Sequence, residues 1–328
     1  MASYIGSRLL QAIPVLALIG LLSFALFAYV GDPVTIMLGQ DYTDAQRIAL
    51  VHTLGLDRPF YIQYLRFLWA ALHGNFGNSY RIAEPVSTLI AQRAPATLEL
   101  ALTGTFISVL IGIPMGVITG IWPRAAFSRV FMVISLIGVS LPVFLTGILL
   151  ILLFSVVLGW LPSFGRGSVV HIGAWWTTGL LTVSGLKSLI LPATTLALFQ
   201  MTLIVRLVRA EMLEVLRTDY IKFARARGLK TRAINFGHAL KNTLVPVITI
   251  IGLQLGGLVA FTLVTETVFQ WPGLGLLFVQ SVAVADIPVM SAYLMMVGVV
   301  FVTINLIVDL LYFAVDPRLR VRRSGGGR

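Results

Sequence analysis

The sequence predicts an all-α integral membrane protein with six transmembrane helices, a long external segment after the first span and a short cytoplasmic helix. Two observations carry this prediction. The 328 residues are 58% hydrophobic and only 11% charged, with a mean hydropathy of +0.93, whereas a soluble domain carries about 25% charged residues. Six uncharged runs approach or exceed the roughly 20 residues with which a helix crosses a bilayer. They are Leu9–Val30, Leu100–Ile121, Val130–Gly159, Ser188–Val205, Asn242–Thr265 and Pro288–Val308.

The runs differ in ways that bear on the number of helices. The first has 22 uncharged residues, more than the roughly 7–15 of a signal-peptide core, and is expected to stay as a helix. The fourth ends at Arg206, which can reach the headgroups from a helix end. The third contains Pro142, so it is either one kinked helix or two half-spans. One kinked helix is favoured, because two full spans need roughly 40 residues.

The Lys and Arg residues orient these spans. If the N-terminus is inside, 17 of the 24 basic residues fall in cytoplasmic segments, most of them in residues 206–241. The positive-inside rule therefore predicts a multi-pass membrane protein with both termini in the cytoplasm. This distribution accounts for the net charge of +11, so the expected partner of the basic residues is membrane lipid and not nucleic acid.

The expected organisation has four parts: the N-terminus and first helix (1–30), an external segment (31–96), a five-helix core (97–315) and a basic cytoplasmic tail (316–328). In the external segment, Tyr61, Tyr64, Leu65 and Leu68 recur at spacings of three and four, which predicts an amphipathic helix. That helix lies either on the outer membrane surface or in a small external cap. The loop between residues 164 and 185 has no periodicity that predicts an element.

Several classes of site are excluded by missing residues. The chain has no cysteine, which removes disulfides, thiolate metal sites and cysteine nucleophiles. It has no Gly-Lys pair and therefore no P-loop for ATP. Its four histidines are scattered without a zinc-hydrolase motif, and no Gly-x-Ser-x-Gly elbow occurs. We expect no catalytic residue, cofactor or metal in this chain.

The basic loop of residues 206–241 contains a candidate docking helix. Tyr220, Phe223, Ala224 and Arg227 recur at spacings of three and four, and Thr218 or Asp219 can cap the start. Gly228 can end the helix in a left-handed conformation. Such a helix fits a groove on a soluble partner. The alternative is an interfacial helix whose Lys222, Arg225 and Lys230 reach anionic lipid.

Short motifs occur in a specific order along nearly the whole chain: Leu54–Pro59, Asn75–Ser79, Pro95–Leu100, Leu191–Ala193, Asp219–Tyr220, Ala224–Leu229, His238–Asn242, Glu266–Phe269, Trp271–Gly275 and Asp316–Arg318. On these motifs the chain resembles the permease subunits of bacterial ABC importers for dipeptides and oligopeptides, and in particular the dipeptide permease B-type subunit. Nickel and glutathione permeases belong to the same group.

The resemblance implies a set of partners. They are a second, related permease, two ATPase subunits that bind ATP and magnesium, and an external substrate-binding protein. It also implies that the cytoplasmic helix is a coupling helix seated on an ATPase subunit. The importer signature Glu-Ala-Ala-x-x-x-Gly matches only Ala224 and Gly228, and Lys222 stands where the signature has its acidic residue. The expected docking residues are Asp219, Tyr220, Phe223, Ala224, Arg227 and Gly228.

The resemblance also implies a cargo of dipeptides or oligopeptides, with nickel or glutathione as the alternative. A different class, the ion-coupled secondary transporter, often has charges at the midplane of its spans, and none stands at the centre of a span here.

Few polar residues lie within or beside the spans. Gln254, Asn305 and Glu266 are the candidates for a pathway or gate, although hydrogen bonds between helices are the simpler expectation for Gln254, Asn305 and also Gln200. Glu99 faces either the headgroups or the bundle interior. Gly112, Gly116 and Gly120 share one helix face, which predicts close packing between helices.

Overall fold

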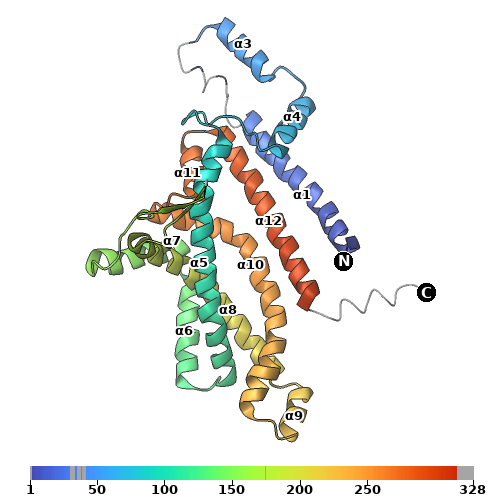
Figure 1. The fold of residues 1–328 in the computed structure, drawn as a ribbon, viewed down its shortest axis with the longest axis vertical. Coiled ribbons are helices and arrows are strands. Elements are labelled where there is room, and N and C mark those ends of the chain that lie inside the picture. Colours follow the sequence, from blue (N-terminus) through green and yellow to red (C-terminus); the bar gives the residue numbers. More distant parts are fainter. Residues whose placement is uncertain (1, 30–33, 35–37, 39–41, 174, 316–328) are drawn as a thin grey trace, which may run out of the picture. The chain divides into compact units, whose positions relative to one another are not determined.

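The computed structural model of the chain describes residues 2–29, 34, 38, 42–173 and 175–315 (Figure 1). The expected basic tail, residues 316–328, lies outside them. The described residues are mostly helical. The helices are α1 (Ala2–Tyr29), α3 (Asp44–Leu54), α4 (Phe60–Leu72), α5 (Val86–Ile121), α6 (Ala126–Ser140), α7 (Val143–Leu150), α8 (Val183–Val215), α9 (Asp219–Ala226), α10 (Leu240–Phe269), α11 (Leu274–Ala283) and α12 (Ile287–Val315), with π-helical segments η1 (Ile151–Val157) and η2 (Ala233–Ala239).

The chain divides into two compact units. The first contains α1, α3, α4, the start of α5, α11 and the first part of α12. The second contains the rest of α5, the helices from α6 to α10, and the end of α12. Their bounds are Met1–Thr97, His171–Thr177 and Pro272–Val302 for the first unit, and Leu98–Val170, Thr178–Trp271 and Thr303–Arg328 for the second.

Three helical stretches among the described residues are long and apolar enough to cross a membrane: Val86–Ile121, Val183–Val215 and Ile287–Val308. Shorter apolar helices cover Leu10–Ala25, Val143–Val157 and Leu274–Ala283. The second expected span lies inside α5, but this helix already begins at Val86, within the segment expected to be external. The chain is therefore a mostly helical membrane protein with three long apolar helices and several shorter ones.

The third uncharged run is broken at Pro142, and the expectation of one kinked helix is wrong. α6 ends at Ser140, and Pro142 precedes α7 in an extended conformation, with φ −58° and ψ 143°. Proline has no amide hydrogen for a helical bond and disfavours helical geometry at the residue before it. α6 and α7 consequently run in different directions (Figure 1), and α7 continues directly into η1.

The glycines of α5 allow close contact with α8 in the second unit. A Cβ at Gly116 would lie 2.5 Å from the Cβ of Val208, and one at Gly120 would lie 2.7 Å from that of Met212. Gly112 is similarly close to Ile204. This confirms the packing role predicted for the glycine face, because only a residue without a Cβ permits this approach.

In the first unit, the loop before α5 is fixed to the start of α12. The Asp286 carboxylate accepts hydrogen bonds from the Ser79 hydroxyl and from the Tyr80 backbone N–H, the latter at 3.1 Å. Asp286 is almost fully buried. Next to this junction, an apolar cluster joins α5, α11 and α12 through Val86, Leu89, Leu277, Val289 and Ala292.

The described part of the external segment contains the predicted amphipathic helix as α4, which begins directly after Pro59. Its apolar residues do not all share one environment. Tyr64 and Leu68 are half-buried, whereas Tyr61 and Leu65 are exposed. In the loop for which the sequence predicted no element, β1 (Val170–Ile172) pairs with β2 (Trp176–Thr178).

Candidate functional site

The helix of the basic loop forms where the sequence predicted it, with both ends defined by the backbone. Thr218 is the N-terminal cap by conformation, but its hydroxyl donates back to the Val215 carbonyl and does not cap the helix. At the other end, Gly228 has φ +78°, which confirms the left-handed ending. Its N–H donates to the Arg225 carbonyl at 2.9 Å. The chain therefore turns sharply after two helical turns.

α9 packs on the rest of the second unit by one buried side. Ile221 and Ala224 pack into a core cluster with Val208, Met212 and Ile234. Ala224 is only 7% exposed, so the expectation that it lies on the docking face is wrong. Its place is set by Ile221, three residues earlier, an aliphatic residue that turns this side of the helix inward. The aliphatic side chain of Ile221 is the sequence signal for this orientation.

The side of α9 next to this buried side exposes three of the predicted residues, Tyr220, Phe223 and Arg227, which we call the docking face. Phe223 is 63% exposed, and the Arg227 guanidinium lies 5.8 Å from the centre of its ring. The Tyr220 hydroxyl accepts a hydrogen bond of 2.6 Å from the Asn242 side chain on α10. An exposed phenylalanine flanked by polar groups on a rigid helix is a suitable anchor for a soluble partner.

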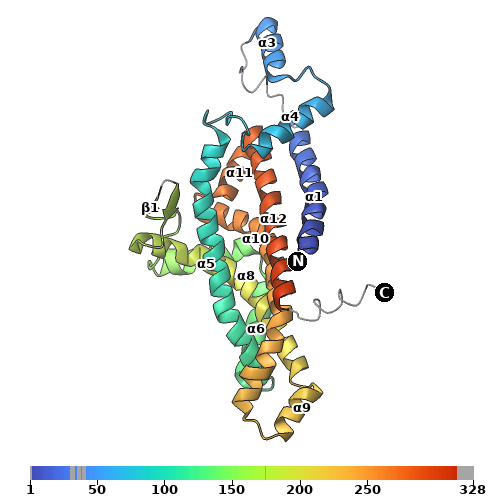
Figure 2. The ribbon, with the colours of Figure 1, turned by 45° about the vertical axis from the view of Figure 1, so that its right-hand side comes forward.

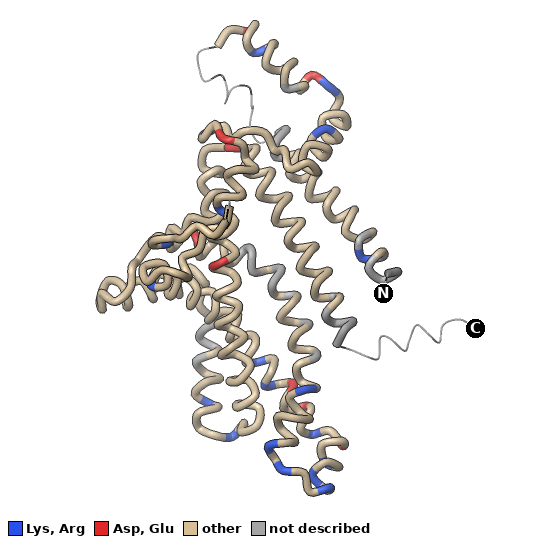
Figure 3. The backbone as a smooth tube through the Cα atoms, viewed as in Figure 1, with Lys and Arg blue, Asp and Glu red and all other residues tan. Residues whose placement is uncertain are grey.

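The basic residues of the loop are exposed as well. Lys222 donates to the Asp219 carboxylate at 2.8 Å, while Arg225 and Lys230 are open to solvent. Figure 3 shows Lys and Arg gathered around α9. The positions of these side chains are compatible with both alternatives, docking and lipid contact.

A buried ion pair, absent from the predicted site, lies elsewhere in the second unit. Glu99 and Arg166 are 4% and 8% exposed. Arg166 donates from Nε to Glu99 Oε2 at 3.1 Å, and from a terminal nitrogen to the same oxygen. The Gly179 N–H donates to Glu99 Oε1 at 3.0 Å, and the guanidinium lies 5.9 Å from the centre of the Trp271 ring. Glu99 thus faces the interior and not the headgroups.

This ion pair connects α5 to the loop between η1 and α8. Because a buried charge needs a partner to offset its lost hydration, the pair fixes where this loop can lie. Both residues stand near the ends of uncharged runs, Glu99 before the second and Arg166 after the third. Opposite charges at such positions are the signal from which the pairing could have been found.

A smaller polar cluster lies among α5, α8 and α10. The Ser108 hydroxyl donates to Gln200 Oε1 at 3.1 Å, which confirms the expected hydrogen bond between helices for Gln200. Ser108 and Gln200 line a small cavity of about 10 Å³, together with Thr105 and the half-buried Gln254. A volume of this size holds about one water molecule. The cluster is therefore a point where polar groups of three helices meet inside the second unit.

The other two gate candidates are not among the described residues that line that cavity. Glu266, near the end of α10, is fully buried, so its side chain is not part of the surface that a soluble protein could touch in this conformation. Its carbonyl accepts the Trp271 N–H at 2.8 Å. Asn305 is half-buried on α12.

Comparisons with known proteins match nearly the whole chain. Residues 112–321 match the family described as the binding-protein-dependent transport system inner membrane component, and residues 1–101 match the N-terminal family of the same systems. The chain is 39% identical to the di/tripeptide transport system permease protein DppB of Pseudomonas aeruginosa (strain UCBPP-PA14), covering 98% of this chain and 100% of that one.

Two further relatives have similar identity. The oligopeptide transport system permease protein AppB of Bacillus subtilis (strain 168) is 40% identical, over 97% of this chain and 99% of the relative. The glutathione transport system permease protein GsiC of Salmonella paratyphi A (strain ATCC 9150 / SARB42) is 38% identical, over 98% and 100%. Among solved structures, an inward-facing MetNI methionine ABC transporter has a similar fold, with a TM-score of 0.56, 21% identity, and coverage of 70% of this chain and 96% of that one.

Proposed function

The chain belongs to the family of binding-protein-dependent inner-membrane transport components, and we propose that it forms half of the pathway of an ATP-driven peptide importer. A membrane component of this kind does no covalent chemistry. Separate ATPase subunits hydrolyse the ATP. The absence of a Gly-Lys phosphate loop from this sequence agrees with that division. The other partners are an external substrate-binding protein and a second, related permease that supplies the other half of the pathway.

The observation that carries the cargo proposal is the agreement among relatives that align over nearly their whole lengths. They are named for di- and tripeptides, oligopeptides and glutathione, and glutathione is itself a tripeptide. Peptides are therefore the common chemistry. Glutathione is the second candidate, because its permease is 38% identical to this chain, close to the 39% of the di/tripeptide permease. No relative described above supports the nickel alternative.

The cargo is tested by competition. Uptake of labelled tri-alanine is measured in cells with and without the chain, alone and with an excess of dipeptide, glutathione or nickel chelate. We expect dipeptides to reduce the uptake strongly and the nickel chelate to leave it unchanged. Competition by glutathione alone would assign the second candidate, and chain-independent uptake of every peptide tested would refute the proposal.

We propose that α9 transmits movement between the ATPase subunits and the membrane helices. The docking face of α9 is open to a partner, whereas Ile221 and Ala224 on its buried side pack with residues of α8 and η2 in one core cluster. A force on Phe223 would therefore act on packed helices and not on a free loop. As ATP binding closes the ATPase pair, this connection would move the helices between outward-open and inward-open states. Gln254, Glu266 and Asn305 remain the candidates for pathway or gate residues.

The proposed topology has six spans and both termini in the cytoplasm, as the distribution of basic residues predicts. The absence of cysteine allows a direct test. Ala49→Cys on α3 and Arg225→Cys on α9 both place a thiol at an exposed position. A membrane-impermeant thiol reagent should label the first variant in intact cells and the second only after lysis. The reverse pattern would contradict this orientation.

A further inference from the structure

α4 lies against the middle of an apolar helix. The Tyr64 hydroxyl donates to the Ala17 carbonyl of α1 at 2.8 Å. The Phe24 ring lies 5.1 Å from that of Phe60, and a Cβ at Gly20 would lie 2.7 Å from Leu68. These α1 residues belong to the uncharged run Leu9–Val30. A helix that contacts the middle of a membrane span is at the depth of the lipid and not in the surrounding water.

The side of α4 that faces away from α1 is apolar and exposed. Tyr61, Leu65 and Trp69 recur every four residues and are between 61% and 67% exposed. They line a shallow groove of about 450 Å³ together with Ile62 and Arg66. Tyrosine and tryptophan are enriched at membrane interfaces, where one end of the side chain meets hydrocarbon and the other meets water. The groove therefore fits an acyl chain.

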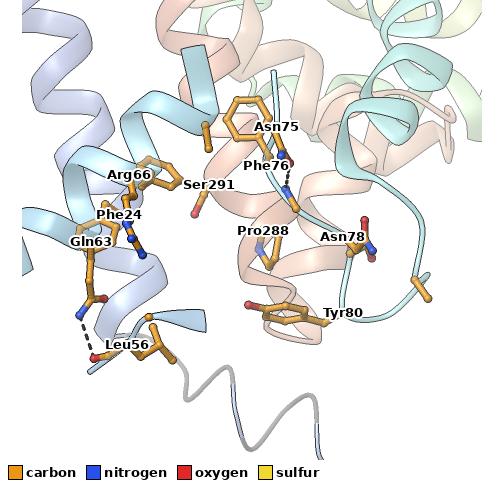
Figure 4. A pocket seen from close by; sticks show the side chains of 16 residues that line it. Phe24, Leu56, Gln63, Arg66, Asn75, Phe76, Asn78, Tyr80, Pro288 and Ser291 are labelled. Atoms are coloured by element: carbon orange, nitrogen blue, oxygen red, sulfur yellow. Dashed lines mark hydrogen bonds between the residues drawn. The ribbon is translucent and has the colours of Figure 1, made fainter. Parts of the chain in front are cut away.

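Arg66 lies between this groove and a second cavity, of about 610 Å³, which is within the size range of ligand pockets. In Figure 4, Arg66 and Gln63 line one side of the cavity, and Asn78 and Tyr80 line the other. Among the described residues that line the two cavities, Arg66 is the only charged one. Within the described part of the chain, its guanidinium has no hydrogen bond or ion pair.

The opposite wall offers neutral hydrogen-bonding groups. The Asn78 side chain and the Tyr80 hydroxyl make no hydrogen bond with another described residue. Burial, and secondarily the nearby charge of Asp286, raise the pKa of Tyr80 to about 12. Its phenol is therefore protonated at neutral pH and can donate a hydrogen bond. An uncompensated guanidinium facing neutral donors is a suitable site for a phosphate group.

We propose that α4 and the two cavities bind an anionic phospholipid, with its phosphate at Arg66, its headgroup toward Asn78 and Tyr80, and one acyl chain along Tyr61, Leu65 and Trp69. A soluble anion would use the guanidinium and leave the adjoining apolar groove empty. A phospholipid can use both cavities, because Arg66 lines both of them. A phosphate bound at Arg66 therefore leaves its attached acyl chain next to the apolar groove. A headgroup without its own cation is favoured, since a second positive charge would stand beside Arg66.

The test uses the intact transporter, purified in detergent and depleted of lipid. Phosphatidylglycerol, phosphatidylcholine or soluble glycerol 3-phosphate is added, and the retained lipid is counted by native mass spectrometry. We expect phosphatidylglycerol to be retained in preference to phosphatidylcholine. Arg66→Gln should weaken its binding roughly tenfold or more, as expected for losing a charge-assisted hydrogen bond. Leu65→Asn, in the groove, should also weaken the binding of phosphatidylglycerol, without changing the thermal stability of the complex.

The matched control is Arg81→Gln, which removes an exposed arginine of the same segment that lines neither cavity. This variant should retain phosphatidylglycerol like the wild type. Equal retention by the Arg66→Gln variant would overturn the proposal, as would equal retention of the two lipids by the wild type. Displacement of the lipid by glycerol 3-phosphate at equal concentration would assign a soluble-anion site in place of a lipid site.

Discussion

Replacing Glu99 by glutamine is expected to destabilise the chain by about 3–5 kcal/mol, the cost of leaving a buried charge without its partner. Glutamine keeps the shape of the side chain and can still accept the Gly179 N–H through its amide oxygen. The variant therefore removes mainly the charge that offsets Arg166, which is 8% exposed. The loss is measured as a lower Tm and a lower yield of the assembled transporter.

Two further variants separate the ion pair from a general packing defect. Arg166→Gln should be as damaging as Glu99→Gln, because it leaves the carboxylate buried and unpaired. The double variant should be more stable than either single one, since it leaves no uncompensated charge. The exposed pair of Asp219 and Lys222 provides the control, and Asp219→Asn should leave the Tm nearly unchanged. If Glu99→Gln unfolds at the wild-type temperature, the ion pair does not fix the loop.

Replacing Phe223 by aspartate is expected to abolish both ATPase docking and peptide uptake while the chain still inserts and folds. The side chain is 63% exposed, so the change costs little packing inside the chain. A buried aromatic anchor at an interface commonly contributes about 2 kcal/mol or more, roughly thirtyfold in affinity, and an unpaired charge in the groove adds to the loss. Docking is measured by co-purification of the ATPase subunits.

The alternative, lipid contact by the basic residues, predicts the opposite pattern. A variant with Lys222, Arg225 and Lys230 all replaced by glutamine should dock and transport nearly normally if the aromatic face is the contact. Ala224→Glu is not an equivalent probe, because Ala224 lies in the core cluster and a charge there would disrupt folding. If Phe223→Asp docks normally and the triple variant fails to dock, the docking face of α9 does not contact the ATPase subunits.

Features that depend on local sequence could be predicted. The helical spacing of apolar residues predicts α4. The conformational freedom of glycine predicts the end of α9 at Gly228. The absence of a side chain predicts the close packing at Gly112, Gly116 and Gly120. The motifs that identify the family are also local. These predictions hold because short stretches of chain decide them.

Features that depend on distant partners could not be predicted. The break at Pro142 could not be predicted, because a proline alone permits either a kink or a break. The direction of α7 depends on the residues that surround it in the fold. The inward position of Ala224 follows from the cluster that surrounds Ile221. The pairing of Glu99 with Arg166 joins residues on separate elements, and the Arg66 cavity is lined by three separate parts of the first unit: α1, residues 55–83 and the start of α12. No pattern within one helix specifies such contacts.

The central claim, that this chain is a non-catalytic permease subunit driven by partner ATPases, is tested most directly in proteoliposomes. The chain, its partner permease and the ATPase subunits are reconstituted with the external binding protein, and uptake of labelled tri-alanine is measured with and without ATP. We predict accumulation that requires ATP, requires every subunit, and survives collapse of the ion gradients. Uptake by this chain alone, driven by an ion gradient and indifferent to ATP, would contradict the claim.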